Sequence, residues 1–323
     1  ALCFPLIFYV AFVYGLLPGM FLTLVAYYYF IKYTKEKHWY QLVISALSIN
    51  LAILLIGNNL IHLLAIFAVA VIYFIRNKDW KIIAFILSCV FLMSASKSVI
   101  TNYYEVKSQK EIAEGVPKIT WIAMGMQEGE REAGWWNRFN YDIMPEEEYD
   151  EKRITKISKT SMKQRLNVFR DNPRYALDFY QRKYENQFIE PTFQSLLVTA
   201  PQRNFSNETT LEKIRDFFVK QIYFNHTHKV LEFIMKVFQV FSYLFTFVFA
   251  VVMYKQKNEF FAIIPIAFIG GTLFNMIWEA KSRYIFPYFV FLIPLSAYGL
   301  IIVRNKIKEY KKLKEEKDEK TTI

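Results

Sequence analysis

The sequence predicts an all-α polytopic membrane protein with about eight transmembrane helices and one mainly helical extracytoplasmic domain. Three observations support this fold class. Of the 323 residues, 54% are hydrophobic, and they gather in runs of about 15 to 25 residues, the length that crosses a bilayer as a helix. Short basic clusters separate the runs, as water-facing loops do in membrane proteins. One long polar stretch, residues 100–228, interrupts the series.

Each apolar run gives one predicted span. The stretch from Ala1 to Tyr33 is too long for a single helix and breaks at Gly15 and at Pro18-Gly19, so it gives two spans. The chain opens inside an apolar run, and we therefore expect the first span to be truncated and the N-terminal part of a longer protein to be missing. The predicted spans are, approximately, residues 1–14, 18–34, 41–56, 60–75, 82–99, 233–254, 260–278 and 284–303.

The basic clusters predict the orientation. The loops at 32–38, 76–81 and 255–257 and the tail 304–323 are all rich in lysine or arginine. Eight spans place all four on one side, which the positive-inside rule identifies as the cytoplasm. The predicted division is five spans over 1–99, an outer domain over 100–228, three spans over 229–303 and a cytoplasmic basic tail over 304–323. The expected location is a bacterial plasma membrane.

The outer domain reads as mainly helical. Pro145, followed by three glutamates, predicts a helix start, because proline fits the first turn and acids favour the positive end of the helix dipole. Asn172-Pro173 predicts a second helix that runs to about Gln187. Thr209 or Thr210 predicts a third, which leads directly into the sixth span. The segment Lys118–Met124 leaves helix and strand both open.

Composition excludes two classes of site. The formal net charge is +11, but its lysines and arginines flank apolar runs, which explains them without a nucleic-acid partner. Cys3 and Cys89 both fall inside apolar runs, so neither a disulfide nor a zinc site is expected. His226 and His228 lack a neighbouring acidic cluster, and we assign no metal site to them. The need for a divalent metal stays undetermined.

The segment from Trp278 to Pro287 is the strongest candidate site. Glu279, Lys281 and Arg283 crowd a very short outer loop, and Tyr284 follows. A charge at the membrane edge loses hydration unless a partner replaces it, so such residues are often functional. Arg283 suits bidentate phosphate binding and Lys281 adds a point charge. An ordinary charged turn with side chains that reach for water is the alternative.

Two further groups are weaker candidates. Asn58, Asn59 and His62 lie at the outer end of a span, where they would line a cavity or bond neighbouring helices. Trp135, Trp136, Arg138 and Asp142 combine aromatic rings with polar groups, a composition that suits sugars, and we assign them to acceptor binding. The alternative for both tryptophans is a place in the domain core or at the lipid headgroups.

One pattern at the start of a late span resembles multispan glycosyltransferases of the GT-C type. It reads Glu279-x-x-x-Arg283-Tyr284-x-x-Pro287, and an apolar helix and a basic tail follow it. More narrowly it is similar to bacterial protein-mannosyltransferase-like proteins (glycosyltransferase family 39), whose C-terminal portion the chain would match. The segments Lys118–Gly125 and Glu190–Gln194 resemble the outer domain of Gram-positive relatives. At Gly57-Asn58-Asn59 the chain departs from the Lys-Pro-Asn that the family often has.

The resemblance implies a membrane enzyme that takes a sugar from a polyprenyl-phosphate carrier. The enzyme would pass the sugar to a glycan, lipid or protein acceptor outside the membrane. The family's catalytic carboxylate lies in a first outer loop that this chain lacks, so the catalytic residues are unknown. The resemblance assigns Arg283 to the carrier phosphate, with Glu279, Lys281 and Tyr284 beside it. No cofactor is implied; the lipid-linked sugar is the donor substrate.

Two other functions fit the same residues. A transporter or flippase for a lipid-linked sugar would also need outer cationic groups, but transporters usually carry charges near the midplane of the membrane. The centres of the predicted spans are almost free of charge, which favours the enzyme. A non-catalytic membrane protein of envelope assembly is the third possibility, and an acidic pair in a first outer loop would distinguish it from an enzyme.

Overall fold

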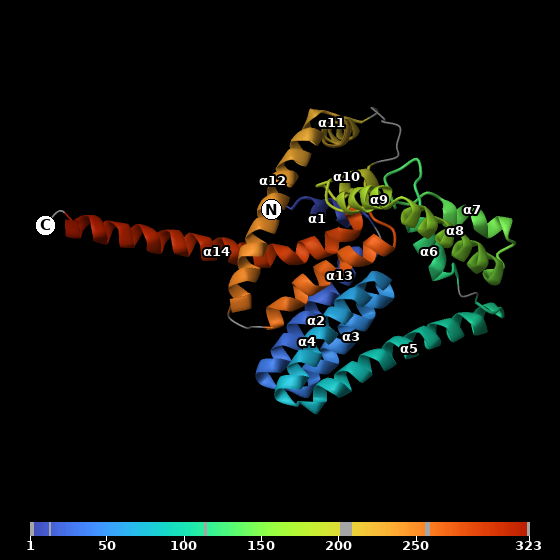
Figure 1. Cartoon of the computed structure of the whole chain (residues 1–323), viewed down its shortest axis with the longest axis horizontal. Helices are drawn as coiled ribbons and strands as arrows, with labels where there is room; N and C mark the ends of the chain where they lie inside the picture. Colours follow the sequence, from blue (N-terminus) through green and yellow to red (C-terminus); the bar gives the residue numbers. More distant parts are fainter. Residues whose placement is uncertain (1–2, 13, 113–114, 201–208, 256–258, 322–323) are drawn as a thin grey trace.

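The computed structural model describes residues 3–12, 14–112, 115–200, 209–255 and 259–321, and over these residues the protein is all-helical. This confirms the predicted helical class, and the segment that left helix and strand open is a helix. Figure 1 shows the course of the chain. The α-helices are α1 Pro5–Phe8, α2 Leu16–Glu36, α3 Trp39–Leu55, α4 Leu60–Asn77, α5 Trp80–Ser108, α6 Lys118–Gly125, α7 Phe139–Glu146, α8 Glu151–Asp171, α9 Pro173–Glu185, α10 Ser195–Val198, α11 Thr210–Phe224, α12 His226–Lys255, α13 Ile263–Ile277 and α14 Ser282–Thr321, and the 3₁₀ helices are η1 Tyr9–Ala11, η2 Gly57–Asn59 and η3 Glu259–Ala262.

Five stretches of helix among the described residues are long and apolar enough to cross a membrane. They are Gly57–Asn77, Trp80–Ser108, Thr227–Lys255, Phe260–Ile277 and Ser282–Lys314. The apolar helix α3 is shorter, at 17 residues. The 21 residues of α2 would extend over roughly 32 Å, the thickness of a bilayer core. Seven of the eight predicted spans therefore correspond to a helix.

The first predicted span, residues 1–14, does not form a single helix. Its described part holds only α1, of four residues, and η1, of three. The reason is a contact distant in sequence: the Tyr9 hydroxyl donates a hydrogen bond to the carbonyl of Phe193, and the Tyr9 ring stacks on Phe286 at 4.6 Å. Gly15, with φ of 71°, then turns the chain into α2. This segment packs against α14 instead of crossing beside it.

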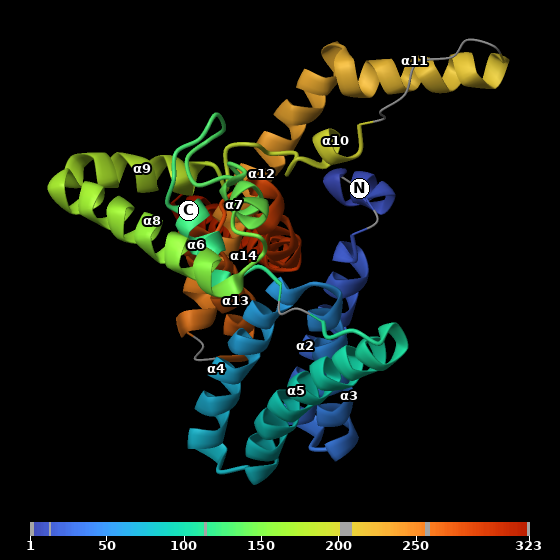
Figure 2. The ribbon, with the colours of Figure 1, turned by 90° about the vertical axis from the view of Figure 1, so that its right-hand side faces the viewer.

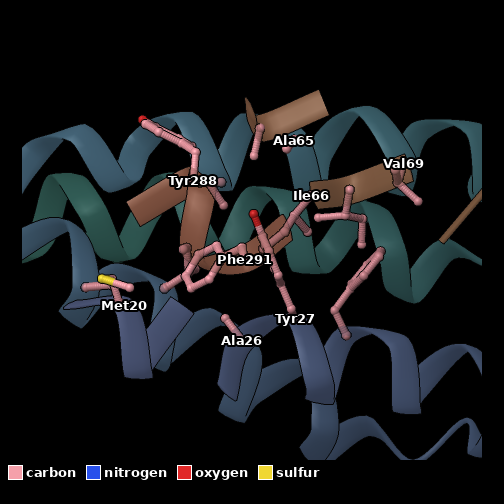
Figure 3. Close-up of a cluster of buried hydrophobic side chains, with 14 of the residues drawn as sticks. Met20, Ala26, Tyr27, Ala65, Ile66, Val69, Tyr288 and Phe291 are labelled. Carbon is pink, nitrogen blue, oxygen red and sulfur yellow. The ribbon is translucent and has the colours of Figure 1, made fainter. Parts of the chain in front are cut away.

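The helices pack as pairs around one apolar core. Contacts join α2 to α3, α4 to α13, and α12 to α14. Figure 3 shows the centre of the core, where Tyr27 of α2, Ile66 of α4 and Phe291 of α14 meet; all three are buried. At Gly299 of α14 a Cβ atom would lie 1.9 Å from the carbonyl oxygen of Phe245. Only glycine permits this approach of α14 to α12.

Two turns and the start of η3 lie together at one end of the helices. Lys37, after α2, places Nζ 3.2 Å from Oδ2 of Asp79, which precedes α5. The Tyr33 hydroxyl also donates to Asp79, at 2.7 Å. The ring of Tyr73 lies 5.7 Å from that of Phe260, in η3. The predicted basic loops 32–38 and 76–81 thus share one end with the start of η3, while residues 256–258 lie outside the described residues.

The opposite end carries α6 to α11 (Figures 1 and 2). Two helix starts there confirm the sequence analysis. The Asn172 side chain accepts from the N–H of Tyr175 at the start of α9, and Thr209 forms a capping box with Glu212 at the start of α11. The helix start at Pro145 was wrong, because the chain turns at Glu148 and Tyr149, both with positive φ.

The corrected boundaries are as follows. Pro145 lies inside α7, and Asp150 caps α8 by accepting from the N–H of Arg153 at 2.9 Å. Helix α5 continues past the predicted end of its span, residue 99, to Ser108. Helix α14 begins at Ser282, contains Pro287 and Pro294, and continues through most of the predicted tail (Figure 1).

Candidate functional site

Two adjoining cavities lie at the end of the helices that carries α6 to α11, and residues of α6 and of the loop before α7 line the second of them. The first has a volume of about 400 Å³ and is lined by Tyr9, Phe12, Tyr14, Leu16, Leu55, Ile56, Gly57, Asn58, Asn59, His62, Arg283, Tyr284, Pro287 and Tyr288. The second has a volume of about 490 Å³ and is lined by Tyr14, Asn58, Trp121, Arg131, Trp135, Trp136, Phe274, Asn275, Trp278, Glu279, Arg283 and Tyr284. We call them the helix cavity and the tryptophan cavity.

The cavities meet at a shared set of residues: Tyr14, Asn58, Arg283 and Tyr284 line both. Arg283 stands in the first turn of α14, and its Nη2 donates to the Tyr284 hydroxyl at 2.6 Å. The guanidinium also lies 4.8 Å from the centre of the Tyr284 ring. A half-buried arginine therefore stands at the junction between an apolar compartment and an aromatic one.

Contacts with the turn between α9 and α10 fix the start of α14. The Ser282 hydroxyl donates to Oε2 of Glu190, at 3.1 Å. Glu190 also accepts from the backbone and hydroxyl of Thr192 and from the backbone of Gln194. The Phe193 ring packs on Phe286 and Phe289, with centroids 5.3 Å and 4.8 Å away. The Glu190–Gln194 turn, which the resemblance singled out, thereby positions Arg283.

Glu279 is the buried acid of the tryptophan cavity. It is 6% exposed, and its Oε1 has no hydrogen-bond partner among the described residues. Burial raises the pKa of this carboxyl, while hydrogen bonds from Tyr284 and the Trp136 backbone and the charges of Arg283 and Arg131 act in the opposite direction. The carboxyl thus has an acceptor oxygen without a partner, on a residue that lines the tryptophan cavity.

Tryptophan rings form much of the wall of this cavity. Trp121 and Trp278 stack with centroids 6.4 Å apart and planes 12° apart, and Phe274 stacks on Trp278 at 5.3 Å. The Arg131 guanidinium lies 4.6 Å from the Trp135 ring and 4.9 Å from the Trp136 ring. The wall therefore draws on α6, α13 and the loop before α7.

The structure brings together most of the residues that the sequence suggested. Glu279 and Tyr284 line the tryptophan cavity with Trp135 and Trp136, and Arg283 joins them. The sequence analysis had placed these tryptophans with an acceptor and Glu279 with a carrier. In the structure they share one compartment.

Asn58, Asn59 and His62 line the helix cavity, as expected. His62 is buried, within 2.6 Å of the Tyr27 hydroxyl through Nδ1, and it stacks on Tyr288 at 4.8 Å. Asn59 donates to the carbonyl of Ala52 at 2.8 Å. Both side chains therefore bond within the bundle, and Asn58 is the one that reaches both cavities.

Three of the predicted residues lie elsewhere. Lys281 lines neither cavity; its Nζ pairs with Oε1 of Glu132 at 2.5 Å and lies 4.2 Å from the Trp135 ring. This pair of a buried lysine and an exposed glutamate gives Lys281 a role in holding two loops together. Arg138 and Asp142 pair with each other at 3.4 Å and line a third cavity of about 840 Å³, which shares Arg131 and Trp136 with the tryptophan cavity.

Lys183 is a buried residue of the site that the sequence analysis missed. Its Nζ donates to the carbonyl oxygens of Gly125 and of Trp278, the latter at 2.7 Å. Burial lowers the pKa of Lys183 to about 7, although the charge of Glu279 acts in the opposite direction. One signal was available: Lys183 follows the core residue Phe179 by four positions, on the buried face of α9.

A comparison with protein families covers this whole arrangement. A family model described as a conserved hypothetical integral membrane protein matches residues 2–300. The chain belongs to this family. No curated protein and no solved structure matches it. Membership in a family of integral membrane proteins confirms that the long apolar helices belong in a bilayer, and both cavities fall within the matched residues.

The described residues of this family member hold no group of three or more histidine, cysteine and acidic side chains close enough to bind a metal ion. His228, one of the pair noted in the sequence, lies 3.3 Å from Glu232. Arg131, Tyr9, Tyr14 and Trp121 line the cavities without having been singled out. Their places depend on contacts between segments far apart in the chain.

Proposed function

We propose that this integral membrane protein is a glycosyltransferase that takes a sugar from a polyprenyl-phosphate carrier and passes it to a glycan, lipid or protein of the cell envelope. The place of Arg283 carries the proposal, since it lines both the apolar helix cavity and the tryptophan cavity. A glycosylated carrier has three parts in a matching order, which are a hydrocarbon tail, a phosphate and a sugar.

Arg283 has the chemistry that a carrier phosphate needs. A guanidinium presents several N–H donors in one plane and can bond two phosphate oxygens at once. Its partial burial among aromatic rings reduces screening by water, so its charge acts more strongly on a nearby anion. Phenylalanine, leucine, isoleucine and proline in the helix cavity offer an apolar surface for the first isoprene units.

The proposed reaction substitutes one bond at the anomeric carbon of the sugar. An acceptor hydroxyl oxygen bonds to this carbon, and the bond from the carbon to the phosphate oxygen breaks with its electron pair left on the phosphate. Arg283 stabilises the charge that builds up on this leaving group. The hydroxyl proton passes to a base that we assign to no described residue. The reaction takes place on the outer side of a bacterial plasma membrane, with the C-terminus in the cytoplasm.

The test is sugar transfer in membranes that contain the protein expressed from its complete gene. Polyprenyl-phosphate-linked hexoses serve as donors, and transfer to endogenous acceptors is measured for wild type, Arg283→Ala and Arg283→Lys. We expect Arg283→Ala to reduce transfer by about a hundredfold, the loss typical when one donor to a developing charge is removed. Arg283→Lys should retain part of the activity, because it keeps the charge and loses the two-point contact.

Arg153→Ala is the matched control, because Arg153 is an exposed arginine of α8 that lines neither cavity. It should transfer sugar like wild type. Movement of the carrier across the bilayer without any transfer would support a flippase instead. If the protein bound the carrier but neither transferred the sugar nor moved the carrier, the result would support a non-catalytic envelope protein.

A further inference from the structure

The tryptophan cavity contains a hydrogen-bond acceptor that the protein does not use. Glu279 is only 6% exposed, yet its Oε1 has no hydrogen-bond partner among the residues that the structure describes. An unpaired buried carboxylate oxygen is costly, and native proteins rarely leave one unless a ligand or water completes it. The free oxygen lies on a residue that lines a cavity of about 490 Å³, a volume within the range of small-molecule sites.

The rest of this cavity combines flat rings with donors. Four tryptophans line it, and all four are half-buried, so each keeps part of its ring surface accessible. Asn58 and Arg131 supply N–H donors on the same lining, whereas the buried Asn275 donates to Oε1 of Gln187, at 3.4 Å. A pyranose ring has one face of C–H groups that packs on an indole and a rim of hydroxyls that both donate and accept. Ring surface, donors and a free acceptor are the three features that such a ring needs.

The charged side chains of the lining indicate which class of sugar the cavity can bind. Arg131 already lies over Trp135 and Trp136, and Lys281 is paired with Glu132. With the carrier phosphate at Arg283, the remaining ionisable side chains of opposite charge in the lining are Arg131 and Glu279, so their charges balance and no positive charge is left over to hold a carboxylate. An uncharged hexose fits this balance better than a uronic acid.

We infer that the tryptophan cavity binds the pyranose ring of an uncharged hexose, with Oε1 of Glu279 accepting a hydrogen bond from one of its hydroxyls. The inference rests on the proposed function, because the hexose is the sugar that the carrier presents beyond the phosphate at Arg283. It adds a separate claim, namely that the protein distinguishes a glycosylated carrier from a bare one. Glu279 is then a specificity-determining residue.

The experiment compares two ligands with the purified full chain in nanodiscs. Binding of bare polyprenyl phosphate and of polyprenyl-phosphate-linked glucose, galactose and mannose is measured for wild type, Glu279→Gln and Glu130→Gln. We expect wild type to bind at least one hexose-linked carrier about tenfold more tightly than the bare carrier, the gain expected from a hydrogen bond to a charged group. Glu279→Gln should lose most of this preference and bind the bare carrier as wild type does.

Glu130→Gln is the matched control, since Glu130 lines the third cavity and not the tryptophan cavity. It should keep the full preference. Equal binding of bare and hexose-linked carriers by wild type would overturn the inference and leave the proposed function intact. If Glu279→Gln weakened the binding of both ligands equally, Glu279 would have a structural role, and this result would also overturn the inference. Failure of wild type to bind the bare carrier would count against the phosphate site at Arg283 itself.

A uronic acid on the same carrier is the fourth probe. We expect it to bind no more tightly than the bare carrier in wild type and to gain affinity in Glu279→Gln, because the substitution removes a like charge. Preference of wild type for the uronic acid over every hexose would overturn the assignment to an uncharged sugar.

Discussion

Lys183 of α9 donates a hydrogen bond from Nζ to the carbonyl oxygen of Trp278, 2.7 Å away. The two residues are 95 positions apart in the chain. The same ammonium donates to the carbonyl of Gly125, at the end of α6. One buried side chain thus connects α6 and α9 to the loop that carries Glu279, and the shape of the tryptophan cavity depends on it.

Lys183 predicts a pH dependence of stability. Its pKa is about 7 in the folded protein and about 10.4 in an unfolded chain. Between these values the unfolded chain binds the extra proton, so the free energy of unfolding should rise with pH by at most about 1.4 kcal/mol per unit. Below pH 7 both states hold the proton and Lys183 contributes no slope. Thermal unfolding in detergent from pH 6 to pH 10 measures this.

Lys183→Met is the comparison, because methionine fills similar space without titrating. The variant should be less stable, since two carbonyls lose a donor, and its stability should lack the additional rise above pH 7. The neighbouring titratable and charged groups remain in both proteins. Glu279 acts on the pKa of Lys183, and Tyr284 and Arg283 act on that of Glu279. An identical slope in the two proteins would contradict the lowered pKa.

Gly134 should tolerate no side chain. A Cβ atom there would lie 2.5 Å from Cδ of Lys183 and 2.9 Å from the carbonyl oxygen of Gly125, and its φ is 68°. Overpacking of this kind costs about 1 to 3 kcal/mol, and the left-handed backbone adds about 1 kcal/mol. Gly134→Ala should therefore lower the unfolding temperature and expose the segment from α6 to α10 to protease. Gly57→Ala is the control, because nothing lies within 4 Å of its Cβ position, and an equal loss in both variants would refute the close approach.

The orientation of the chain can be read with a membrane-impermeant maleimide. In a background with Cys3 and Cys89 replaced by alanine, Arg153→Cys and Lys81→Cys place single thiols at exposed positions. The positive-inside rule puts Lys81 in the cytoplasm and α8 outside. Intact cells should label only Arg153→Cys, and permeabilised cells should label both. Labelling of Lys81→Cys alone in intact cells would mean the inverted orientation.

Helix α11 should lie in the outer headgroup layer. It runs crosswise to α12, into which it leads (Figure 2), and it exposes Leu211, Ile214 and Phe218 at 80%, 51% and 57%. An amphipathic helix next to a membrane span buries such a face in the interface. Spin labels at Leu211→Cys and Phe218→Cys should be more accessible to oxygen than to a polar nickel chelate, with the reverse at Lys213→Cys. Equal accessibility at all three sites would place α11 in water.

The sequence predicted the parts of the fold that local chemistry determines. Asn172-Pro173 and the Thr209–Glu212 box use contacts within one turn, so the pattern alone locates both helix starts. Pro145 misled the same reasoning, because the positive φ of Glu148 and Tyr149 delays the next helix. The stretch 1–14 misled it as well, since Tyr9 is held by Phe193 and Phe286, which no local rule could supply.

The site also contains residues that the sequence predicts and residues whose place depends on distant contacts. Glu279, Arg283 and Tyr284 are neighbours in sequence and stay together in space. Lys281 belongs to the same run, but its partner Glu132 is 149 positions away and removes it from the cavity lining. The burial of Lys183 depends on the meeting of α6, α9 and the loop before α14, and only a three-dimensional arrangement shows that.

The two prolines of α14 have a mechanical consequence. Proline has no N–H, so Pro287 and Pro294 leave the carbonyls of Arg283 and Val290 without their usual helical donors. In hydrocarbon such carbonyls must face protein or a water-filled space. Pro287 and Arg283 both line the helix cavity, so the first of these two carbonyls belongs to a residue of the cavity wall. A turn of α14 about its own axis that brought either carbonyl to face lipid would cost free energy, so the two missing bonds restrict how α14, and Arg283 with it, can rotate.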